Sequence, residues 1–219
     1  MPQAIIFDVE ATDKNDAVII EAASLDVTSL NPFEVGNPWV QRYNPGKPIS
    51  LGALATHHIM DEELVNCPAS SSFRLPAGTK YLIGHNIDFD WVAIGSPEVK
   101  RICTLALARS LWPELDSHTQ SALLYYFERD TAREQLRNAH SALADVWICS
   151  KIVAQIIDKL HPVSLDALWE MSEKARIPKT MPYGKHKGEL ISQVPTDYKQ
   201  WLLRQDNVSG YLRKALEAK

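Results

Sequence analysis

The chain begins with a short apolar run that ends in two carboxylates. Residues 4–7 read Ala-Ile-Ile-Phe without a polar side chain, which is typical of a strand buried on both faces of a sheet. Asp8 and Glu10 follow, and two residues that are two apart on an extended segment share one face. The chain is therefore expected to carry a strand through its core and to present two carboxylates where that strand meets solvent.

Strand-like segments come early in the chain and helix-like segments come later. Further strands are predicted at residues 18–27, 38–43, 81–84 and 101–103. Apolar residues recur near a 3.6-residue period over residues 140–160, which predicts a helix there. This order favours an α/β fold in which helices flank a mixed sheet.

The length and composition fit one substantial core with a small appendage. The chain has 219 residues, of which 45% are hydrophobic, and this argues against bulk disorder. We find no apolar stretch long enough to span a bilayer, and residues 1–3 lack the pattern of a signal peptide. Cys67, Cys103 and Cys149 are odd in number and widely spaced, so we expect free thiols in a reducing compartment, the cytoplasm.

The net charge of −4 is unevenly distributed along the chain. Residues 1–173 hold 13 Lys and Arg against 23 Asp and Glu, whereas residues 174–219 hold 10 against 4. An acidic body with a basic tail suits a polyanionic substrate, because cations can neutralise the acidic site while the tail attracts phosphates. A solvated terminal helix rich in lysine would give the same count, so charge alone does not decide.

A second acidic motif follows the strand predicted at residues 81–84. It reads His85-Asn86-Ile87-Asp88-Phe89-Asp90 and leads into a helical segment. Asp90 is the stronger candidate to reach the end of the sheet where Asp8 lies. Asp88 can be explained as a solvated or capping residue near the helix start, and His85 as a structural histidine.

A third motif combines a histidine with a further carboxylate, His140-Ser141-Ala142-Leu143-Ala144-Asp145. Residues five apart do not share a helical face, so we expect Asp145 on the helix and His140 on a less regular lead-in. A histidine side chain exchanges protons near neutral pH and is suited to act as a general base.

Together the three motifs supply four carboxylates and one histidine. Hard divalent cations prefer oxygen ligands, and two such cations need several shared carboxylates. The inventory indicates metal-dependent phosphoryl chemistry. It consists of Asp8, Glu10, Asp90, Asp145 and His140.

In this order the motifs resemble those of the DEDDh family of 3′–5′ exonucleases. That family has an apolar strand ending in Asp-x-Glu-Thr-Thr or similar, then His-Asn-x-x-Phe-Asp, then His-x-Ala-x-x-Asp. The resemblance covers roughly residues 1–160 and fills all five catalytic positions, with Ala11 where the family often has threonine.

The resemblance implies an RNase H-like fold with a mixed five-stranded sheet flanked by helices, and a two-metal mechanism. Asp8, Glu10, Asp90 and Asp145 would hold two Mg²⁺ or Mn²⁺ ions, and His140 would take the proton of the attacking water. The substrate would be a DNA 3′ end, single-stranded or duplex, and the product a nucleoside 5′-monophosphate. A role in DNA repair is expected.

Five further residues are expected to contact the 3′-terminal nucleotide. They are Ala11 and Thr12, through their backbone, together with His57, Ile59 and Phe89. Apolar and aromatic groups can stack on bases without reading sequence. Packing in the core explains Ile59 and Phe89 about equally well.

Three regions are expected along the chain. Residues 1–160 form the exonuclease domain, residues 161–178 a helix and linker, and residues 179–219 a small basic module. The module resembles the C-terminal region of a DNA-degrading member of the same family. Its lysines are candidates for a clamp on nucleic acid, or else ordinary surface residues of a small packed unit.

Two other functions remain open. The active-site motifs do not separate DNA from RNA, so an RNA 3′–5′ exonuclease of the RNase T or oligoribonuclease type is one alternative. The other is a proofreading or nucleic-acid-binding subunit. RNA as a partner and a homodimer are left open, and no membrane partner is expected.

Overall fold

The computed structural model describes residues 3–138 and 140–218 of the chain. A five-stranded mixed sheet lies at its centre, with the strand order β3-β2-β1-β4-β5. β2 pairs antiparallel with β1 and β3, whereas β4 runs parallel to β1 and β5 parallel to β4. The strands are β1 (Ala4–Ala11), β2 (Ile19–Leu30), β3 (Phe33–Arg42), β4 (Tyr81–Gly84) and β5 (Lys100–Cys103). The predicted mixed five-stranded sheet is confirmed.

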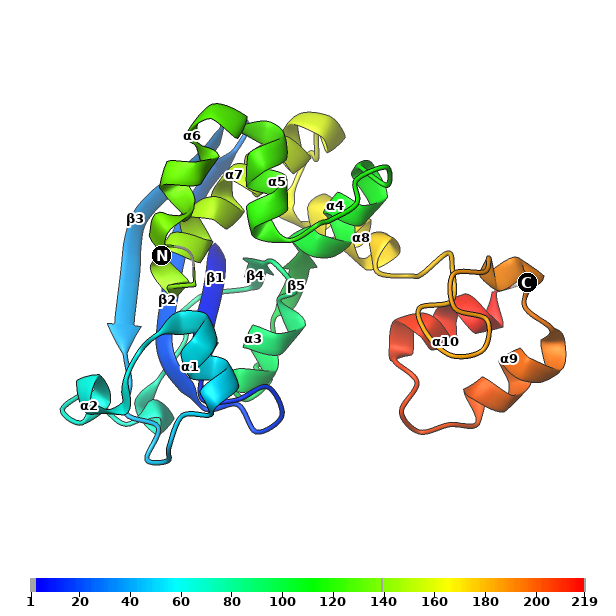
Figure 1. Ribbon diagram of the computed structural model, residues 1–219. Coiled ribbons are helices and arrows are strands. Elements are labelled where there is room, and N and C mark those ends of the chain that lie inside the picture. The colour runs from blue at the N-terminus through cyan, green and yellow to red at the C-terminus, as the bar shows by residue number, and fades with distance from the viewer. Residues whose placement is uncertain (1–2, 139, 219) are drawn as a thin grey trace.

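Helices flank the sheet, and most of them come after its last strand in the sequence (Figure 1). Three lie between the strands: α1 (Leu51–His57), α2 (Asp61–Leu64) and α3 (Asp88–Ala93). Five follow β5: α4 (Thr104–Leu111), α5 (Gln120–Phe127), α6 (Arg129–Gln135), α7 (Ala142–Leu160) and α8 (Leu165–Ala175). Two close the chain: α9 (Thr196–Leu203) and α10 (Gly210–Glu217). None of these helices is both long and apolar enough to cross a membrane.

The apolar run of β1 separates two hydrophobic layers. Ala4 and Ile6 pack in the layer that contains α7, whereas Ile5 and Phe7 pack in the opposite layer with residues of α3. The four side chains are at most 1% exposed, so β1 is buried on both faces, as its composition predicts. This alternation fixes the face on which the carboxylates that follow must lie.

α7 is the longest helix and packs across β1 and β2. Ser141 caps it by accepting a hydrogen bond from the N–H of Ala144 (3.4 Å), and His161 ends it in the left-handed conformation. Val146, Ile152 and Val153 are among its fully buried residues, which fits the predicted helical period. The helix therefore holds its first turn against the end of β1.

Residues 181–216 have a hydrophobic cluster of their own. Figure 1 shows α9 and α10 set apart from the sheet and joined to α8 by an extended segment. The members of the cluster that are most buried include Met181, Leu202 and Leu212. We refer to residues 179–218 as the C-terminal module; where the chain divides into folding units stays a prediction.

Candidate active site

β1 brings Asp8 and Glu10 to the same side of the sheet as α7. Because side chains alternate along a strand, the two carboxylates continue the face on which Ala4 and Ile6 meet α7. Both are only partly buried, since they lie near the end of the strand. Two carboxylates thus point toward the N-terminal end of α7.

The first turn of α7 supplies a third carboxylate, Asp145. A helix N-terminus carries partial positive charge from its free N–H groups, which favours a carboxylate there. Oxygen atoms of Asp8, Glu10 and Asp145 lie within 4.8 Å of one another, close enough to share a cation. Two elements far apart in the sequence therefore meet at one acidic cluster.

Asp90 reaches the same end of β1 from α3. Its Oδ1 accepts a hydrogen bond from the backbone N–H of Val9 (2.9 Å), between Asp8 and Glu10, and the residue is 4% exposed. The turn from β4 into α3 passes very close to β1. A Cβ on Gly84 would lie 2.8 Å from the carbonyl oxygen of Phe7, so only glycine fits.

Asp88, the rival of Asp90 in the same motif, has other partners. Its carboxylate binds the guanidinium groups of Arg101 and Arg176, the latter at 2.7 Å. Among the residues that the structure describes, no lysine or arginine forms an ion pair with Asp8, Glu10, Asp90 or Asp145. Asp88 is thus neutralised by arginines, and the four clustered carboxylates are left for another cation.

Burial and mutual repulsion favour the protonated form of these carboxyls. Burial is the main reason that the pKa of Glu10 is raised to about 9 and that of Asp90 to about 7, and neighbouring carboxylates add to both. The pKa of Asp8 is raised for the same two reasons. Burial also raises the pKa of Asp145, which His140 lowers in part. A divalent cation would relieve this repulsion.

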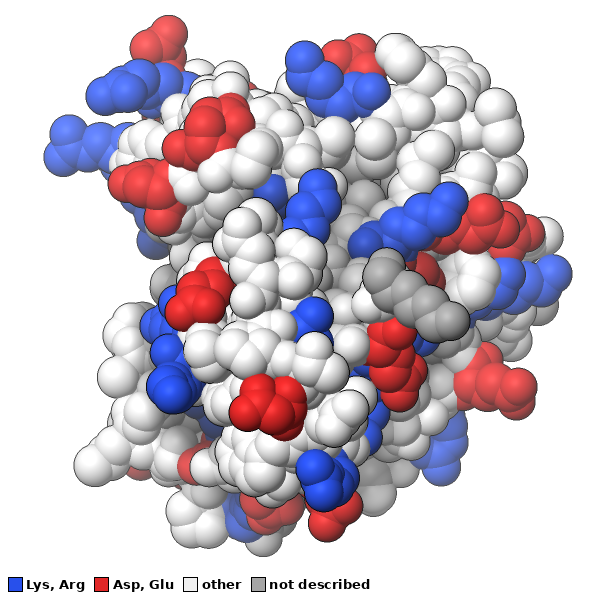
Figure 2. Space-filling view, turned by 90° about the vertical axis from the view of Figure 1, so that its right-hand side faces the viewer, with Lys and Arg blue, Asp and Glu red and all other residues white. Residues whose placement is uncertain are grey.

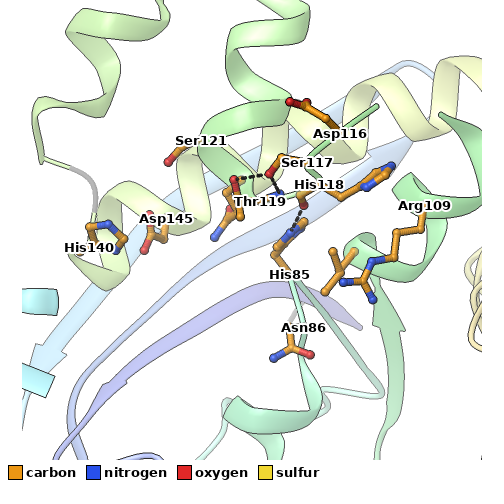
Figure 3. A pocket seen from close by; sticks show the side chains of 12 residues that line it. His85, Asn86, Arg109, Asp116, Ser117, His118, Thr119, Ser121, His140 and Asp145 are labelled. Atoms are coloured by element: carbon orange, nitrogen blue, oxygen red, sulfur yellow. Dashed lines mark hydrogen bonds between the residues drawn. The ribbon is translucent and has the colours of Figure 1, made fainter. Parts of the chain in front are cut away.

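His140 lies on the lead-in to α7, as the five-residue spacing predicts. It is exposed and has a positive φ of 67°, a conformation that is uncommon outside glycine and is found at functional sites. Figure 3 shows it beside Asp145 at one end of a cavity of about 690 Å³, with His85 and Arg109 toward the other end. The histidine thus faces an open, polar cleft beside the carboxylates.

His85 has a structural role in the lining of this cleft. Its Nε2 donates to the carbonyl oxygen of His118 (2.8 Å), so its Nδ1 is free to accept from the hydroxyl of Thr104 (2.9 Å). Burial lowers the pKa of His85 to about 4, which keeps the ring neutral. It ties the second motif to the loop before α5.

Glu21 is a site residue that the sequence interpretation missed. It lies opposite Glu10 on β2, and its Oε1 accepts a hydrogen bond from the backbone N–H of Ala142 (3.1 Å). Its Oε2 binds Nε of Arg42 (2.9 Å), although the residue is only 5% exposed. A carboxylate within the apolar run of residues 18–23 was the signal that could have found it.

The five residues expected to contact a nucleotide are mostly buried. Ala11, Thr12, His57 and Ile59 are at most 7% exposed, and Phe89 is half-buried. The hydroxyl of Thr12 accepts from the N–H of Val18 (3.2 Å), and Nδ1 of His57 accepts from that of Ile59 (3.0 Å). Little of the surface of the first four is therefore open to a nucleotide, and their role stays a prediction.

Comparison with known proteins gives relatives over most of the chain. Exodeoxyribonuclease 10 of Escherichia coli K12 is 26% identical over 205 residues, which cover 91% of this chain and 90% of that protein. A structure of exonuclease X in complex with 5′-overhanging duplex DNA is 25% identical, with a TM-score of 0.64 over 77% of this chain and 99% of that one. The resemblance that the motifs indicate is confirmed.

A more distant structure confirms the fold. The nuclease domain of 3′hExo, described as a DEDDh family member bound to rAMP, is 13% identical and covers 72% of this chain and 92% of that one, with a TM-score of 0.56. The predicted RNase H-like architecture is therefore correct. Separately, residues 173–218 match a family model described as "Putative quorum-sensing-regulated virulence factor".

Proposed function

We propose that this chain, which is similar to exonuclease X and to DEDDh nuclease domains, is a metal-dependent 3′–5′ exonuclease acting on DNA 3′ ends. One observation carries the proposal beyond fold and resemblance. Carboxylate oxygens of Asp8, Glu10 and Asp145 converge within 4.8 Å, and Asp90 joins them through its bond to Val9. Such an oxygen-rich cluster, to which no lysine or arginine among the described residues is ion-paired, suits hard divalent cations.

The four carboxylates would hold two Mg²⁺ or Mn²⁺ ions. When bound, two such ions lower the pKa of an attacking water and stabilise the charge that develops on the leaving oxygen. Glu10 on β1 and Asp145 on α7 would hold the ions from two different elements. Burial and mutual repulsion raise the pKa values of these carboxyls, so their ionised forms are unfavourable without a counter-charge. Bound cations would supply that counter-charge.

His140 would act as the general base. It is exposed at the edge of the cleft beside Asp145, where it can take a proton from the attacking water. Attack on the last phosphodiester breaks the bond between phosphorus and the 3′ oxygen of the preceding nucleotide. The products are a nucleoside 5′-monophosphate and a chain shortened by one, which suits a cytoplasmic enzyme of DNA repair.

Matched 5′-labelled DNA and RNA oligomers, digested side by side with Mg²⁺, test the proposal. We expect a DNA ladder that shortens from the 3′ end, and no ladder with EDTA or with Asp8→Ala. Degradation of RNA alone would move the enzyme to the RNase T or oligoribonuclease type. Both oligomers left intact would contradict the nuclease proposal and favour a proofreading or nucleic-acid-binding subunit.

A further inference from the structure

The C-terminal module carries a row of aromatic side chains that runs from the edge of its hydrophobic core, where Tyr198 packs, to the surface. The rings of His186 and Tyr198 meet edge to face at 4.6 Å between centroids, and Tyr198 and Trp201 follow at 5.5 Å. Trp201 is 50% exposed. Tyr183, which lies on the same loop as His186, is 43% exposed. Large aromatic groups left in solvent beside polar ones mark interaction surfaces.

The loop of residues 182–189 is built around Tyr198. The tyrosine hydroxyl accepts a hydrogen bond from the backbone N–H of Lys185 (3.3 Å). Gly184 has a φ of +81°, and a Cβ there would lie 2.5 Å from that hydroxyl oxygen, so glycine is required. The loop is thus seated on the ring, and it leaves Lys185 and Lys187 exposed beside the aromatic row.

The charge around this row favours an anionic ligand. Residues 174–219 hold 10 Lys and Arg against 4 Asp and Glu, the reverse of the preceding body. The acidic residue of the loop, Glu189, binds Nδ1 of His186 (2.9 Å). Figure 2 views the molecule from the side of the module and shows basic side chains spread among uncharged and some acidic ones. Positive charge is therefore available, but not as one dense patch.

Flat exposed rings beside separate positive charges fit one class of ligand. Bases of a single strand stack on aromatic rings without sequence preference, while lysines follow the phosphates. We infer that a surface formed by Tyr183, Lys185, His186, Lys187, Tyr198 and Trp201 binds single-stranded nucleic acid. The inference rests on the proposed function in one respect: the bound strand is taken to be the oligomer that the enzyme degrades.

The module is attached to the body beside the motif that carries Asp90. The hydroxyl of Tyr211 donates to Glu173 on α8 (2.7 Å), and the guanidinium of Arg176 lies 5.2 Å from the centre of the Tyr211 ring. The same arginine binds Asp88 (2.7 Å), two residues before Asp90. The module is thus fixed to the body next to the second acidic motif.

Binding of a 5′-labelled oligothymidylate, followed by fluorescence anisotropy at several salt concentrations, tests the inference. The full chain is used with Asp90→Asn, so that the probe is not digested. Each stacked base contributes about 1–3 kcal/mol, so we expect Tyr183→Ala with Trp201→Ala to weaken binding by about 10-fold or more. Trp201→Phe, which keeps a ring, should retain most of the affinity that Trp201→Ala loses.

The contribution of Lys185 and Lys187 is measured separately, through the salt dependence of binding. Neutralising two phosphate contacts lowers the slope of log K against log salt by about 0.7 for each charge, so Lys185→Gln with Lys187→Gln should flatten it by roughly 1.4. Two matched controls lie outside the C-terminal module. They are Lys159→Gln, at an exposed lysine on α7, and Trp39→Ala, at a tryptophan on β3 that is 40% exposed. Neither control should change affinity or slope.

Two outcomes separate this inference from the proposed function. Unchanged binding by both double variants would overturn the inference and leave the surface to a protein partner. In the otherwise wild-type chain, the aromatic double variant should raise KM for a long oligomer but leave cleavage of a dinucleotide unchanged. If the wild-type chain cleaved neither substrate, the proposed function would fail whatever the binding result.

Discussion

Glu21 on β2 holds the N-terminus of α7 through the backbone N–H of Ala142, at 3.1 Å. Ala142 is two residues after His140 and three before Asp145. The bond therefore sets the position of the proposed general base and of one proposed metal ligand against β1. Arg42 binds the other oxygen of Glu21 but is 40% exposed on its side chain, so that ion pair adds little.

Changing Glu21 should reduce turnover more than substrate affinity. Glu21→Ala leaves the buried N–H of Ala142 without its acceptor, which costs about 1–3 kcal/mol of folding stability. Glu21→Gln keeps an acceptor oxygen and should lose less of both stability and kcat. Urea denaturation and steady-state kinetics of the two variants measure this. Equal kcat in Glu21→Ala and the wild type would show that Glu21 does not position α7.

Asp90→Asn should separate catalysis from folding. The amide oxygen can still accept from Val9, and removing one charge relieves repulsion in the cluster, so stability without metal should not fall. Loss of a charged ligand should reduce cleavage by about 10³-fold. Asp8→Ala and Asp145→Ala should likewise nearly abolish cleavage in folded proteins. Wild-type turnover by purified Asp90→Asn protein would contradict the assignment of Asp90 to the active site.

Asp88→Asn should show the opposite behaviour. It removes the nearer of the two carboxylates that pair with Arg176 (Asp88 at 2.7 Å, Glu173 at 3.6 Å), whose side chain is only 4% exposed, and should cost about 1–3 kcal/mol of stability. Since Asp88 lies outside the cluster, the folded fraction should retain most of its activity. Thermal denaturation and activity below the transition measure both. Full stability with lost cleavage would make Asp88, rather than Asp90, the active-site residue.

The metal-free protein should become less stable as the pH rises. Burial and neighbouring carboxylates raise the pKa of Glu10 from 4.5 to about 9, so the folded chain binds more protons than the unfolded chain between these values. Stability is then highest below about pH 4.5 and is lost as the pH rises toward 9. Glu10→Gln should flatten this dependence in EDTA, by up to about 1.4 kcal/mol per pH unit.

Urea denaturation at pH 6 and pH 8.5 makes that comparison. Glu62→Gln, an exposed carboxylate on α2, is the matched control and should leave the slope unchanged. Saturating Mg²⁺ should stabilise the wild type more at pH 8.5 than at pH 6, because the ion competes with protons. An identical slope in Glu10→Gln and the wild type would contradict the repulsion argument.

His140→Ala should lower kcat by about 10²–10⁴-fold, as expected for loss of a general base. Because His140 is exposed, its removal should leave folding stability nearly unchanged. The open cleft also admits small bases, so added imidazole should restore part of the rate. Single-turnover cleavage with and without imidazole measures this, with Asp145→Asn as a control that imidazole should not rescue. Normal cleavage by His140→Ala would exclude the base role.

Much of the fold could be predicted from particular runs of residues. The strand at residues 4–7 was evident because no polar side chain interrupts it, and the period of residues 140–160 gave α7. Thr104 is the first residue of α4, and its hydroxyl contacts the carbonyl oxygen of Gly84 (3.2 Å) and Nδ1 of His85 (2.9 Å), partners that no local pattern reports. α5, α6, α9 and α10 were not predicted, because short helices carry little periodic signal.

The site was predictable where spacing alone fixes geometry. The two-residue interval puts Asp8 and Glu10 on one face, and the five-residue interval puts His140 off the helix. The bonds of Glu21 to Ala142 and of Asp88 to Arg176 join residues 121 and 88 positions apart, so they depend on packing that no local pattern reports. Those long-range partners are what only the folded chain shows.

The most direct test of the account is where the metal binds. Crystals of the full chain grown with Mn²⁺ and a DNA oligomer, with anomalous data collected near the manganese edge, locate the ions without assuming a mechanism. We predict two anomalous peaks bounded by Asp8, Glu10, Asp90 and Asp145, and their loss in Asp145→Asn crystals soaked in the same way. Peaks elsewhere on the chain, with none at this cluster, would contradict the central claim.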